Sequence, residues 1–514
     1  MSVPDPASPD GCTRRQLLRG AGGVAALAVS GCGAINVLSR PKRLPQIGSF
    51  AGGPARGVGT FRSRPDLRPP AVSTNAAASA EALRGVDPGF LFLGPGPVSL
   101  TGSEQYGPLI VGRAGAPVWF RPLPAGVQVT NFARSQYRGR PVLVWWEGKV
   151  LQSGYGQGEA VVLDDDYREI ARVRAAGGRS MDLHALTLTP EGTALFTCYP
   201  DTVQMDLSSI DGPRDSHVLE SIIQEVDIAS GRLLFEWRGL QHVPAGASCE
   251  PMGEPYDYLH VNSIQQLPDG NLLISARHTW ALYKLDRRTG DVIWTLGGKR
   301  SQFRMGPGSQ FAWQHDATQL SGRVLTLFDN GSNGPIRTEP ESRGLVLDVD
   351  EPRRRVTVRH VYTSPERLSA GAMGSIQILS DDRVLVGWGV RSHTVEFATD
   401  GTPLLDIALP AGMYSYRGLW LPWRGTPGHR PAVAVGRDRH SGSTIVYASW
   451  NGATEVTGWQ VAAGSRKDQL RPLGIARHHG FETVIPLGAQ HRYASVTALD
   501  RAGRPLRRSP VIQL

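Results

Sequence analysis

The chain has 514 residues, too many for one ordinary hydrophobic core, which favours a large repeat domain together with a smaller one. Its formal net charge is +9, and 50 of its 55 basic residues are arginine. These basic residues are spread along the chain without a run interleaved with aromatic residues, so we do not expect nucleic-acid binding. Short apolar segments between abundant turn residues (61 Gly and 38 Pro) predict an all-β protein.

Residues 1–32 carry two export signals that follow one another. In TRRQLLRG, Arg14 and Arg15 precede the apolar stretch GVAALAVSG, which is too short to cross a bilayer as a helix. This pattern resembles a twin-arginine export signal, and the next letters, VSGC, resemble a lipoprotein cleavage box that ends at Cys32. We therefore expect a lipoprotein of the cell envelope, exported by the twin-arginine route and anchored on the outer side of the membrane through lipid on Cys32. A chance arginine pair in a disordered N-terminus is the alternative.

Residues 33–88 are rich in Pro, Ala, Gly and Ser, and we interpret them as a tether and extended wrap rather than as a domain. From 89 to 425 the chain repeats units of about 40 to 60 residues. Several units close with a glycine turn and a tryptophan strand, as in GRLLFEWRG and GDVIWTLGG. Six such units with four short strands each predict a six-bladed β-propeller, in which the innermost strand of each blade lines a central channel.

One phrase occurs three times within these units, as DLHALTLTPEG around His184, YLHVNSIQQLPDG around His260 and WQHDATQLSG around His315. Each histidine opens an alternating apolar run that breaks at a glycine-containing turn. A residue at one position of a radial repeat projects to an equivalent point in each copy, so the three imidazoles are expected to converge. The sixth unit, GSIQILSDDRVLVGW, aligns with NSIQQLPDGNLLISA but has Ala372 in place of His260. The histidine is therefore not needed for a unit to fold.

Residues 427–514 have a different pattern. Alternating strands, a central tryptophan in VYASWNGATEVTGWQVAAG and the ending YASVTALDRAGRPLRRS resemble a fibronectin type III-like β-sandwich. A seventh blade is the alternative, although the turn that closes a blade is missing.

Four cysteines are present: Cys12, Cys32, Cys198 and Cys249. The first would leave with the signal and the second would carry lipid, so Cys198 and Cys249 remain as a pair in an oxidising compartment. A disulfide between them is plausible, with two buried free thiols as the equally weighted alternative. The chain has no CxxC pair, and no cysteine-based zinc site is expected.

The residues around the histidines suit an anionic group. Asn262 is two positions after His260, so both side chains are expected on the same side of a strand. The following strand ends in SARH, and Arg277 would offer a fork of donors to a tetrahedral oxyanion. We see no carboxylate pair near these residues and no cysteine among them.

The strings YLHVNSI, LLISARHT and VIWTLGG, followed by FAWQHDATQL and LFDNGS, resemble the arylsulfate sulfotransferase family over roughly residues 85–425. The resemblance implies a six-bladed propeller that moves a sulfuryl group from one phenol to another through a covalent sulfohistidine, with neither a nucleotide sulfate donor nor a metal. It makes His315 the nucleophile and gives the sulfuryl oxygens to His260, Asn262 and Arg277. His184 takes the place of the family's further histidine, a proton carrier. The chain lacks the large N-terminal sandwich domain of better-known members.

The physical case for this chemistry does not depend on the resemblance. A neutral imidazole is a competent nucleophile near pH 7, and nearby cationic or donor groups keep it neutral. Preorganised donors would stabilise the charge that develops on the sulfuryl oxygens. A phenolate leaving group benefits from a proton, which His184 would give and later recover from the acceptor phenol. Two successive displacements predict ping-pong kinetics.

Further residues are candidates with weaker grounds. Aromatic side chains could also line the channel mouth, although packing between blades is the favoured alternative for each: Trp145, Trp146, Tyr155, Trp280 and Trp313. Asn330 could form a turn at the channel rim, and His278 is expected to point away from Arg277 if both lie on a strand. No role is assigned to four other histidines: His440, His478, His479 and His491.

Two other functions stay open at this point. A quinoprotein-type dehydrogenase is another exported propeller, but it would need a channel aspartate with calcium ligands and often adjacent cysteines. A non-enzymatic exported lipoprotein that binds partners through its propeller face is also possible in principle, because a fold alone does not imply activity.

Overall fold

The all-β class is confirmed by the computed structural model, which describes residues 44–52, 61–76, 89–98, 105–152, 154–438, 441–488 and 491–514. Within these ranges the chain forms 36 strands and four short 3-10 helices, and no α-helix. No helix in the described ranges is long and apolar enough to cross a membrane. The expected export signal and Cys32 lie outside the described residues, as does His440.

A four-stranded sheet joins the two ends of the repeat region. Its order is β28-β4-β5-β6, so the last strand of the region pairs with the first in antiparallel register, from Met413 opposite Pro97 to Leu421 opposite Phe90. Its strands are β4 (Phe90–Pro97), β5 (Leu109–Val111), β6 (Pro117–Phe120) and β28 (Met413–Leu421). Almost every residue of β4 is buried, which explains its continuous apolar run FLFLGPGP.

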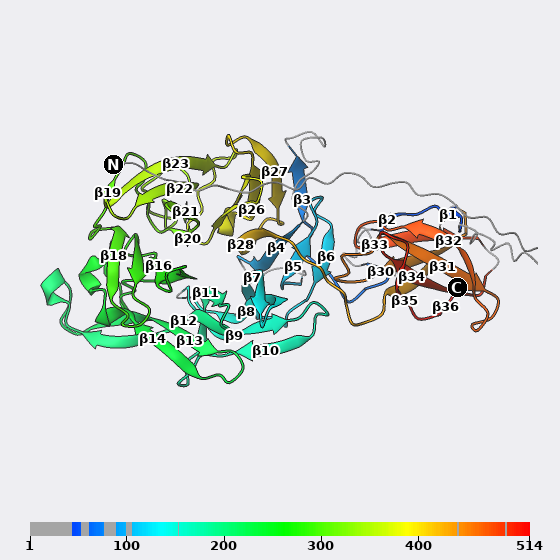
Figure 1. The fold of residues 1–514 in the computed structure, drawn as a ribbon, viewed down its shortest axis with the longest axis horizontal. Helices are drawn as coiled ribbons and strands as arrows, with labels where there is room; N and C mark the ends of the chain where they lie inside the picture. The colour runs from blue at the N-terminus through cyan, green and yellow to red at the C-terminus, as the bar shows by residue number, and fades with distance from the viewer. Residues whose placement is uncertain are drawn as a thin grey trace, which may run out of the picture. The chain divides into compact units, whose positions relative to one another are not determined.

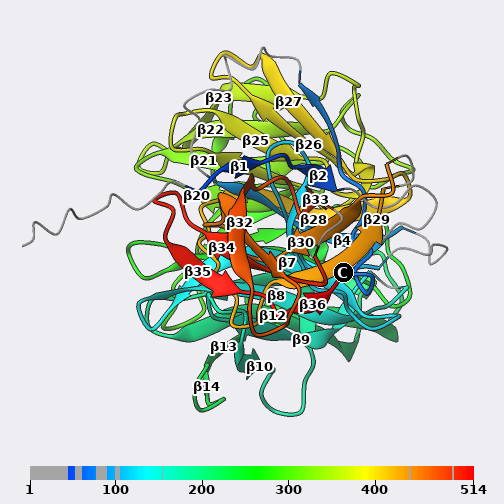
Figure 2. The same ribbon diagram turned by 90° about the vertical axis from the view of Figure 1, so that its right-hand side faces the viewer.

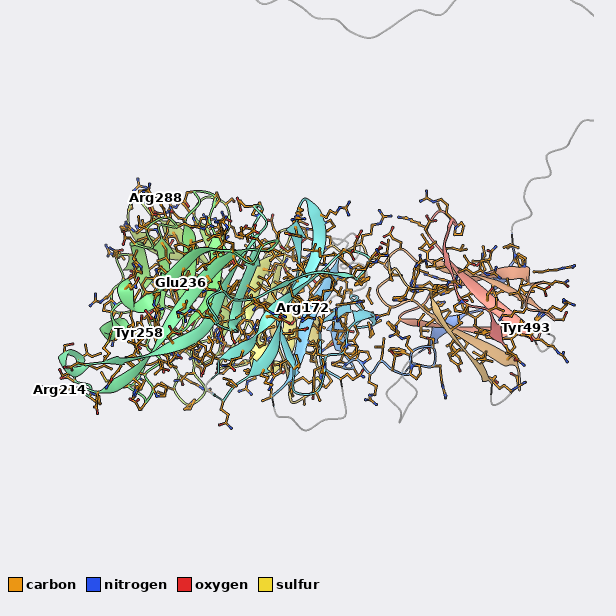
Figure 3. The ribbon with its side chains drawn as sticks, turned by 90° about the horizontal axis from the view of Figure 1, so that it is seen from below. Arg172, Arg214, Glu236, Tyr258, Arg288 and Tyr493 are labelled. Atoms are coloured by element: carbon orange, nitrogen blue, oxygen red, sulfur yellow. The ribbon has the colours of Figure 1, made fainter. Side chains whose placement is uncertain are left out.

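The next eight strands form one sheet made of two antiparallel groups. The groups β7-β8-β9-β10 and β11-β12-β13-β14 are joined between β9 and β11 at the single pair Met181 and Gly158. The hairpin between β12 and β13 extends to Arg214 (Figure 3). The strands are β7 (Gln128–Tyr137), β8 (Arg140–Val150), β9 (Gly156–Leu163), β10 (Glu169–Val173), β11 (Met181–Leu188), β12 (Thr193–Met205), β13 (Ser216–Asp227) and β14 (Leu233–Arg238).

Three further antiparallel sheets complete the repeat region, in the orders β15-β16-β17-β18, β19-β23-β22-β21-β20 and β24-β25-β26-β27-β3. The first comprises β15 (Val261–Gln266), β16 (Leu272–Ala276), β17 (Ala281–Leu285) and β18 (Val292–Gly297). The second comprises β19 (Arg304–Met305), β20 (His315–Gln319), β21 (Val324–Asp329), β22 (Arg343–Asp350) and β23 (Arg355–Thr363). The third comprises β24 (Ser375–Ile378), β25 (Val384–Gly387), β26 (His393–Phe397), β27 (Pro403–Ala408) and β3 (Ser73–Ala76). The 3-10 helices are η1 (Ser208–Ile210), η2 (Gly239–Gln241), η3 (Ala245–Ala247) and η4 (Gly389–Arg391).

The first strand of each group contacts the first strand of the next. Contacts run from β4 to β7, β7 to β11, β11 to β15, β15 to β20, β20 to β24 and β24 to β28, which itself pairs with β4 (Figure 1). Glutamine side chains bridge two of these steps. Gln265 of β15 accepts from the backbone N–H of Gln319 and donates to its carbonyl, and Gln377 of β24 does the same with Trp420 of β28. The first strands are therefore tied to one another by backbone-directed hydrogen bonds.

The C-terminal region consists of two sheets that share one core. One has the order β1-β32-β31-β34-β35 with β36 on β34, and the other β2-β33-β30-β29 (Figure 2). Both contribute to a single buried cluster, with Val446 and Ile485 from one sheet and Trp459 and Val496 from the other. The strands are β29 (Ala432–Arg437), β30 (Thr444–Ser449), β31 (Gly458–Gly464), β32 (Arg471–Arg477), β33 (Glu482–Leu487), β34 (Tyr493–Leu499), β35 (Pro505–Arg508) and β36 (Ile512–Gln513).

The described part of the N-terminal segment adds strands to sheets far away in sequence. β1 (Gln46–Ile47) pairs with β32 and β2 (Phe50–Gly52) with β33, whereas β3 pairs with β27 of the repeat region. Between them, Ser63 donates to the buried carboxylate of Glu482 through both its N–H and its hydroxyl. This segment therefore contacts both the repeat region and the C-terminal sheets.

Candidate active site

Three first strands bring the histidines together, but not from one position in the repeat. Counted back from the residue that begins each hairpin turn, His184 and His315 lie five positions before Thr189 and Leu320, whereas His260 lies seven before Leu267. The expectation of a single position is therefore wrong for His260, and Asn262 is the true counterpart of His184 and His315. His260 lies just before β15 with a left-handed backbone at φ 56, and the register of β15 with β16 shifts between Val261 and Ser263, so strand alternation does not determine where His260 points.

His184 and His260 are in direct contact. Their Nε2 atoms are 3.0 Å apart, and both side chains are buried. The Nδ1 atom of His184 lies 2.6 Å from a carboxylate oxygen of Asp182, and that of His260 lies 2.6 Å from one of Asp257. Each imidazole is thus held between a carboxylate and the other imidazole.

These contacts determine where the protons lie. Burial acts to raise the pKa of Asp257, but its interactions with His260 and His278 outweigh it and the pKa lies well below the ordinary value. The pKa of Asp182 is lowered in the same way, with burial outweighed by its interactions with His184. Both carboxylates are ionised and can only accept, so each histidine carries a proton on Nδ1. The Nε2 contact then requires one further proton between the two rings.

That further proton belongs to His184. Burial lowers the pKa of His260 to about 3, although the neighbouring Asp257 carboxylate acts in the opposite direction. His260 is therefore neutral and accepts at Nε2, so His184 donates at Nε2 while its Nδ1–H bonds to Asp182. In this hydrogen-bond pattern His184 is the donor at both ring nitrogens, to Asp182 through Nδ1 and to His260 through Nε2.

His315 is arranged as a neutral base with an unprotonated Nε2 atom. The amide of Asn330 donates to the carbonyls of Ala370 and Met373, so its oxygen faces His315 Nδ1 at 2.7 Å and accepts a proton from it. The Nε2 atom of His315 is consequently unprotonated, and its only polar neighbour among the described residues is the backbone N–H of Met373 at 3.3 Å. Burial, followed by the charge of Arg277, lowers the pKa of His315 well below its ordinary value.

Arg277 and His278 lie in the turn after β16, and they do not point apart. Arg277 Nη1 donates to His278 Nε2 at 2.7 Å, and Nη2 donates to the carbonyl of Gly371 at 2.9 Å. His278 Nδ1 in turn donates to the carbonyl of Asp257 at 2.6 Å. The expected opposite orientation is wrong because these residues form a turn, where strand alternation does not apply. His278 is a support for the guanidinium.

Asn262 is buried and anchors the histidine of the next strand. Its amide nitrogen donates to the carbonyl of Gln314 at 2.7 Å, and Gln314 directly precedes His315. The amide oxygen of Asn262 has no hydrogen-bond partner among the described residues. Asn262 therefore positions His315 through the backbone.

Two carboxylates at this site were missed from sequence, where no carboxylate pair was expected near the histidines. Asp182 is two residues before His184, and Asp257 is three residues before His260. The acid-to-histidine spacings in DLH and DYLH are the only local signal, and such spacings are common by chance. Only the turn of the chain before β15 brings the Asp257 carboxylate against the His260 ring.

Tyrosines close the site around the histidine pair. The Tyr155 hydroxyl donates to Asp257 at 2.8 Å, and its ring centroid lies 4.8 Å from that of His260. Tyr416 of β28 was not identified from sequence. Its ring centroid lies 6.1 Å from those of both His184 and His315.

The four candidate tryptophans divide into two pairs. Trp145 and Trp146 are fully buried between strands, and Trp146 donates to the carbonyl of Met181. Trp280 follows the Arg277 turn and packs against Trp313 with ring centroids 4.7 Å apart. Trp280 also lines a cavity of about 480 Å³, whose other walls include apolar and charged side chains from Cys249, Lys299, Met305, Phe311 and Glu339. Trp280 is therefore the one of these four tryptophans that lines the cavity, since Trp313 is as buried as Trp145 and Trp146.

The predicted disulfide is not formed, and both Cys198 and Cys249 are free thiols. Cys198 lies in the apolar cluster around β12, packed with Phe196 and Met181. Cys249 lies in the loop before β15, where its Sγ faces the carbonyl of Thr279 at 3.7 Å. The two cysteines belong to different packing environments, which sequence parity could not reveal.

Two groups of described residues have ligand atoms close enough for a metal ion. One is Asp257 with His260 and His278, and the other is the ion-pair group Glu366, His393 and Asp406. In the first group the Nδ1 atoms of both histidines are committed as donors to Asp257. A protonated ring nitrogen has no lone pair for a cation, so the observed hydrogen bonds do not fit metal ligation.

Solved structures with a related architecture share little sequence with this chain. A protein of unknown function from Bacteroides caccae has a TM-score of 0.40 and 12% identity, covering 65% of this chain and 99% of its own. A streptogramin B lyase structure has a TM-score of 0.34 and 12% identity, with coverages of 73% and 94%. Likenesses of this size say nothing about activity. No curated protein sequence matches this chain.

The family model of the arylsulfotransferases (ASST) matches residues 135–409, just over half of the chain. The match contains all three histidines together with Asn262 and Arg277. The chain therefore belongs to the arylsulfotransferase family.

Proposed function

We propose that this protein moves a sulfuryl group from an aryl sulfate ester to a phenolic acceptor in two displacements, through a sulfohistidine on His315 and without a nucleotide donor. The observation that carries the proposal is the tautomer of His315. Asn330 accepts a hydrogen bond from Nδ1–H, so Nε2 of this buried, neutral imidazole is unprotonated and carries only a long hydrogen bond from the backbone N–H of Met373.

In the first displacement, His315 Nε2 attacks the sulfur of the donor. The N–S bond forms as the bond from sulfur to the phenolic oxygen breaks, and the electron pair of that bond leaves with the oxygen. His184, which carries a proton on each ring nitrogen, gives its Nε2 proton to this oxygen. The donor leaves as a neutral phenol.

In the second displacement, the hydroxyl of the acceptor phenol attacks the sulfur of sulfohistidine. His184 recovers a proton from this hydroxyl, the new S–O bond forms, and the N–S electron pair returns to His315 Nε2. The ionised Asp182 stabilises the protonated state of His184 on both occasions. The two displacements therefore need no reactant other than the donor and the acceptor.

Arg277 is the cation that receives the sulfuryl oxygens. Two of its N–H groups are held by His278 and Gly371, which fixes the plane of the guanidinium and leaves its remaining donors for an anion. The proposed roles of His260 and Asn262 toward the sulfuryl group rest on the family resemblance. In this site His260 bonds to His184, and Asn262 holds the strand of His315.

The cavity beside Trp280 is proposed to take a phenolic ring. Trp280 lies three residues after Arg277, and its cavity has aromatic and thioether walls from Phe311 and Met305. An aryl group bound there would have its oxygen directed toward the Arg277 turn. Lys299 at the same cavity would favour rings with an anionic substituent.

We also propose the finer architecture and location. The repeat sheets would be the blades of a six-bladed propeller spanning 89–425, closed by β28 on β4, and 427–514 a fibronectin type III-like sandwich, with 33–88 as tether and wrap. Residues 1–32 would direct export and lipidation at Cys32. Palmitate labelling of the wild type that disappears in Cys32→Ala tests the lipid anchor.

The enzymatic test is sulfuryl transfer from 4-nitrophenyl sulfate to excess phenol, with no nucleotide or metal added. We expect phenol-dependent nitrophenolate release that falls by at least about a thousandfold in His315→Ala. Mass spectrometry of a quenched reaction without acceptor should find one added sulfuryl group on the peptide of His315. Activity retained in His315→Ala would contradict the assignment of the nucleophile, and a silent wild type would favour a binding protein.

A further inference from the structure

A buried hydroxyl without a partner lies beside the histidines. Tyr416 is on β28, is 2% exposed, and its Oη has no hydrogen-bond partner among the described residues. Tyr414, two residues earlier on the same face of the strand, is different, because its hydroxyl donates to Gln128. A buried hydroxyl without a hydrogen-bond partner lowers the stability of the folded protein. In a functional site it marks a position where a ligand would accept or donate the missing hydrogen bond.

The ring of Tyr416 is placed symmetrically with respect to the two reacting histidines. Its centroid is 6.1 Å from that of His315 and 6.1 Å from that of His184, with edge-to-face angles of 73° and 74°. In an in-line displacement between these two residues, the nucleophile is at one end and the protonated leaving oxygen at the other. The three non-bridging oxygens lie in the plane between them, at the level of Tyr416.

We propose that Tyr416 is a further catalytic residue, whose hydroxyl donates a hydrogen bond to a non-bridging oxygen of the sulfuryl group in flight between His315 and the phenolic oxygen. The proposal rests on the proposed sulfuryl transfer and adds a donor from β28 to the donors of Arg277. Tyr155 cannot take this role, because its hydroxyl is already bound to Asp257.

The surroundings of Tyr416 keep it a donor. Burial raises the pKa of its hydroxyl above the ordinary value, so the group remains protonated at any working pH. The charged groups near it are Arg277, Arg417, Asp182 and Asp316, and Arg417 is paired with Asp316 at 3.1 Å. No described side chain competes for the Tyr416 hydroxyl.

Tyr258 offers a matched control. It is also a fully buried tyrosine without a hydrogen-bond partner for its hydroxyl among the described residues, but it packs in the apolar cluster with Trp237 and Leu259. Tyr258→Phe and Tyr416→Phe therefore delete the same atom from equally buried rings. Only the second deletion touches the space between the reacting histidines.

The experiment compares the wild type with both variants in transfer from 4-nitrophenyl sulfate to phenol. We expect Tyr416→Phe to lower kcat/KM by about tenfold to a hundredfold with either substrate varied, since both displacements pass the same sulfuryl plane. Tyr258→Phe should remain within about twofold of the wild type. Both variants should melt at or above the wild-type temperature, because each removes an unpaired buried hydroxyl.

A second measurement uses 4-nitrobenzylsulfonate, in which a methylene replaces the ester oxygen, as a probe that cannot be cleaved. Calorimetric titration should show about tenfold weaker binding to Tyr416→Phe than to Tyr258→Phe. An active wild type with unchanged transfer and unchanged probe binding in Tyr416→Phe would overturn this inference and leave the proposed function standing. A wild type that neither transfers sulfuryl nor binds the probe would overturn both.

Discussion

The strands β15 and β24 have the same backbone and different chemistry. β15 begins a four-stranded sheet and β24 a five-stranded one. Both carry a glutamine two residues before the hairpin, Gln265 and Gln377, that bridges to the next first strand. Five positions before the hairpin, β15 has Asn262 and the chain before β24 has Gly374. His260 of the first sheet corresponds to Ala372 near the other.

This difference separates what the repeat needs to fold from what the site needs to react. The glutamine bridges and the buried apolar positions recur in the sheet whose first strand has no histidine, so they are the structural part of the repeat. The histidines occur only where an ionised carboxylate or an amide fixes their tautomer. In β15 this partner is Asp257, and no carboxylate stands three residues before Ala372.

The largest effect is expected from making β15 resemble β24 at its histidine. His260→Asn removes the acceptor of the His184 Nε2 proton and keeps a residue that tolerates the left-handed backbone at φ 56. We expect kcat/KM for aryl sulfate to fall by at least about a hundredfold while the circular dichroism spectrum stays the same. Activity close to that of the wild type would show that the two strands do not differ in function.

A smaller loss is expected when the histidine is kept and only its carboxylate changes. Asp257→Asn leaves the shape intact but replaces an ionised acceptor of His260 Nδ1 and Tyr155 with an amide. We expect a fall in kcat of about tenfold to a hundredfold. Steady-state kinetics measure this, and Asp269→Asn, in a surface turn of the same sheet, is the control that should show no change.

The response to pH should distinguish the histidine-bearing sheet through stability. Burial keeps His260 neutral in the folded protein with a pKa of about 3, whereas the unfolded residue has a pKa of 6.5. Below pH 6.5 His260 binds a proton in the unfolded state but stays neutral in the folded state. The free energy of unfolding therefore falls on acidification, by up to about 1.4 kcal/mol per pH unit for this group.

The measurement is urea unfolding at several pH values between 7.5 and 5 for the wild type and His260→Asn. Titrating groups that do not contact His260 contribute equally to both proteins, so the difference reports His260 together with its partners Asp257 and His184. Below pH 6.5 the free energy of unfolding of the wild type should fall by up to about 1.4 kcal/mol per pH unit more than that of His260→Asn. Parallel curves would mean that His260 is protonated in the folded state.

The smallest difference is expected at the glutamine bridges. Gln265→Ala and Gln377→Ala each remove two hydrogen bonds to the backbone of the next first strand. We expect each to lower the free energy of unfolding by about 1 to 3 kcal/mol, with little difference between the two. Chemical denaturation measures this, and a much larger loss in one of them would mean that the two sheets are not equivalent in the fold.

Much of the fold could be predicted because it rests on local patterns. Alternating apolar residues and glycine turns predicted an all-β chain, and the alignment of β24 with β15 predicted that His260 has an alanine counterpart, as the hairpins show. The alignment failed between His260 and the other two histidines. The three sequences were aligned on their histidines, whereas the strand register is fixed by the hairpin that follows. His260 lies two residues farther from its hairpin than the other two histidines do.

The candidate site was predicted in its residue types and not in its hydrogen bonds. Strand periodicity places His184, Asn262 and His315 on one side of their strands, and it says nothing about residues in turns. For that reason the orientation predicted for His278 on a strand does not apply in the turn where it lies. Parity left a disulfide between Cys198 and Cys249 and two free thiols equally weighted, and both are free thiols. Asn330 was noted only as a turn residue, although its amide sets the tautomer of His315.

The sequence by itself determined the fold class, the repeat and the residues that give the family resemblance, since these depend on which side chains follow one another. Only the tertiary structure decided the protonation states. A proton goes to whichever nitrogen has an acceptor within hydrogen-bond distance, and those acceptors, Asp182, Asp257 and Asn330, come from separate segments or turns. Likewise, the unpaired hydroxyl of Tyr416 reaches the site only because β28 returns from the end of the repeat region to pair with β4.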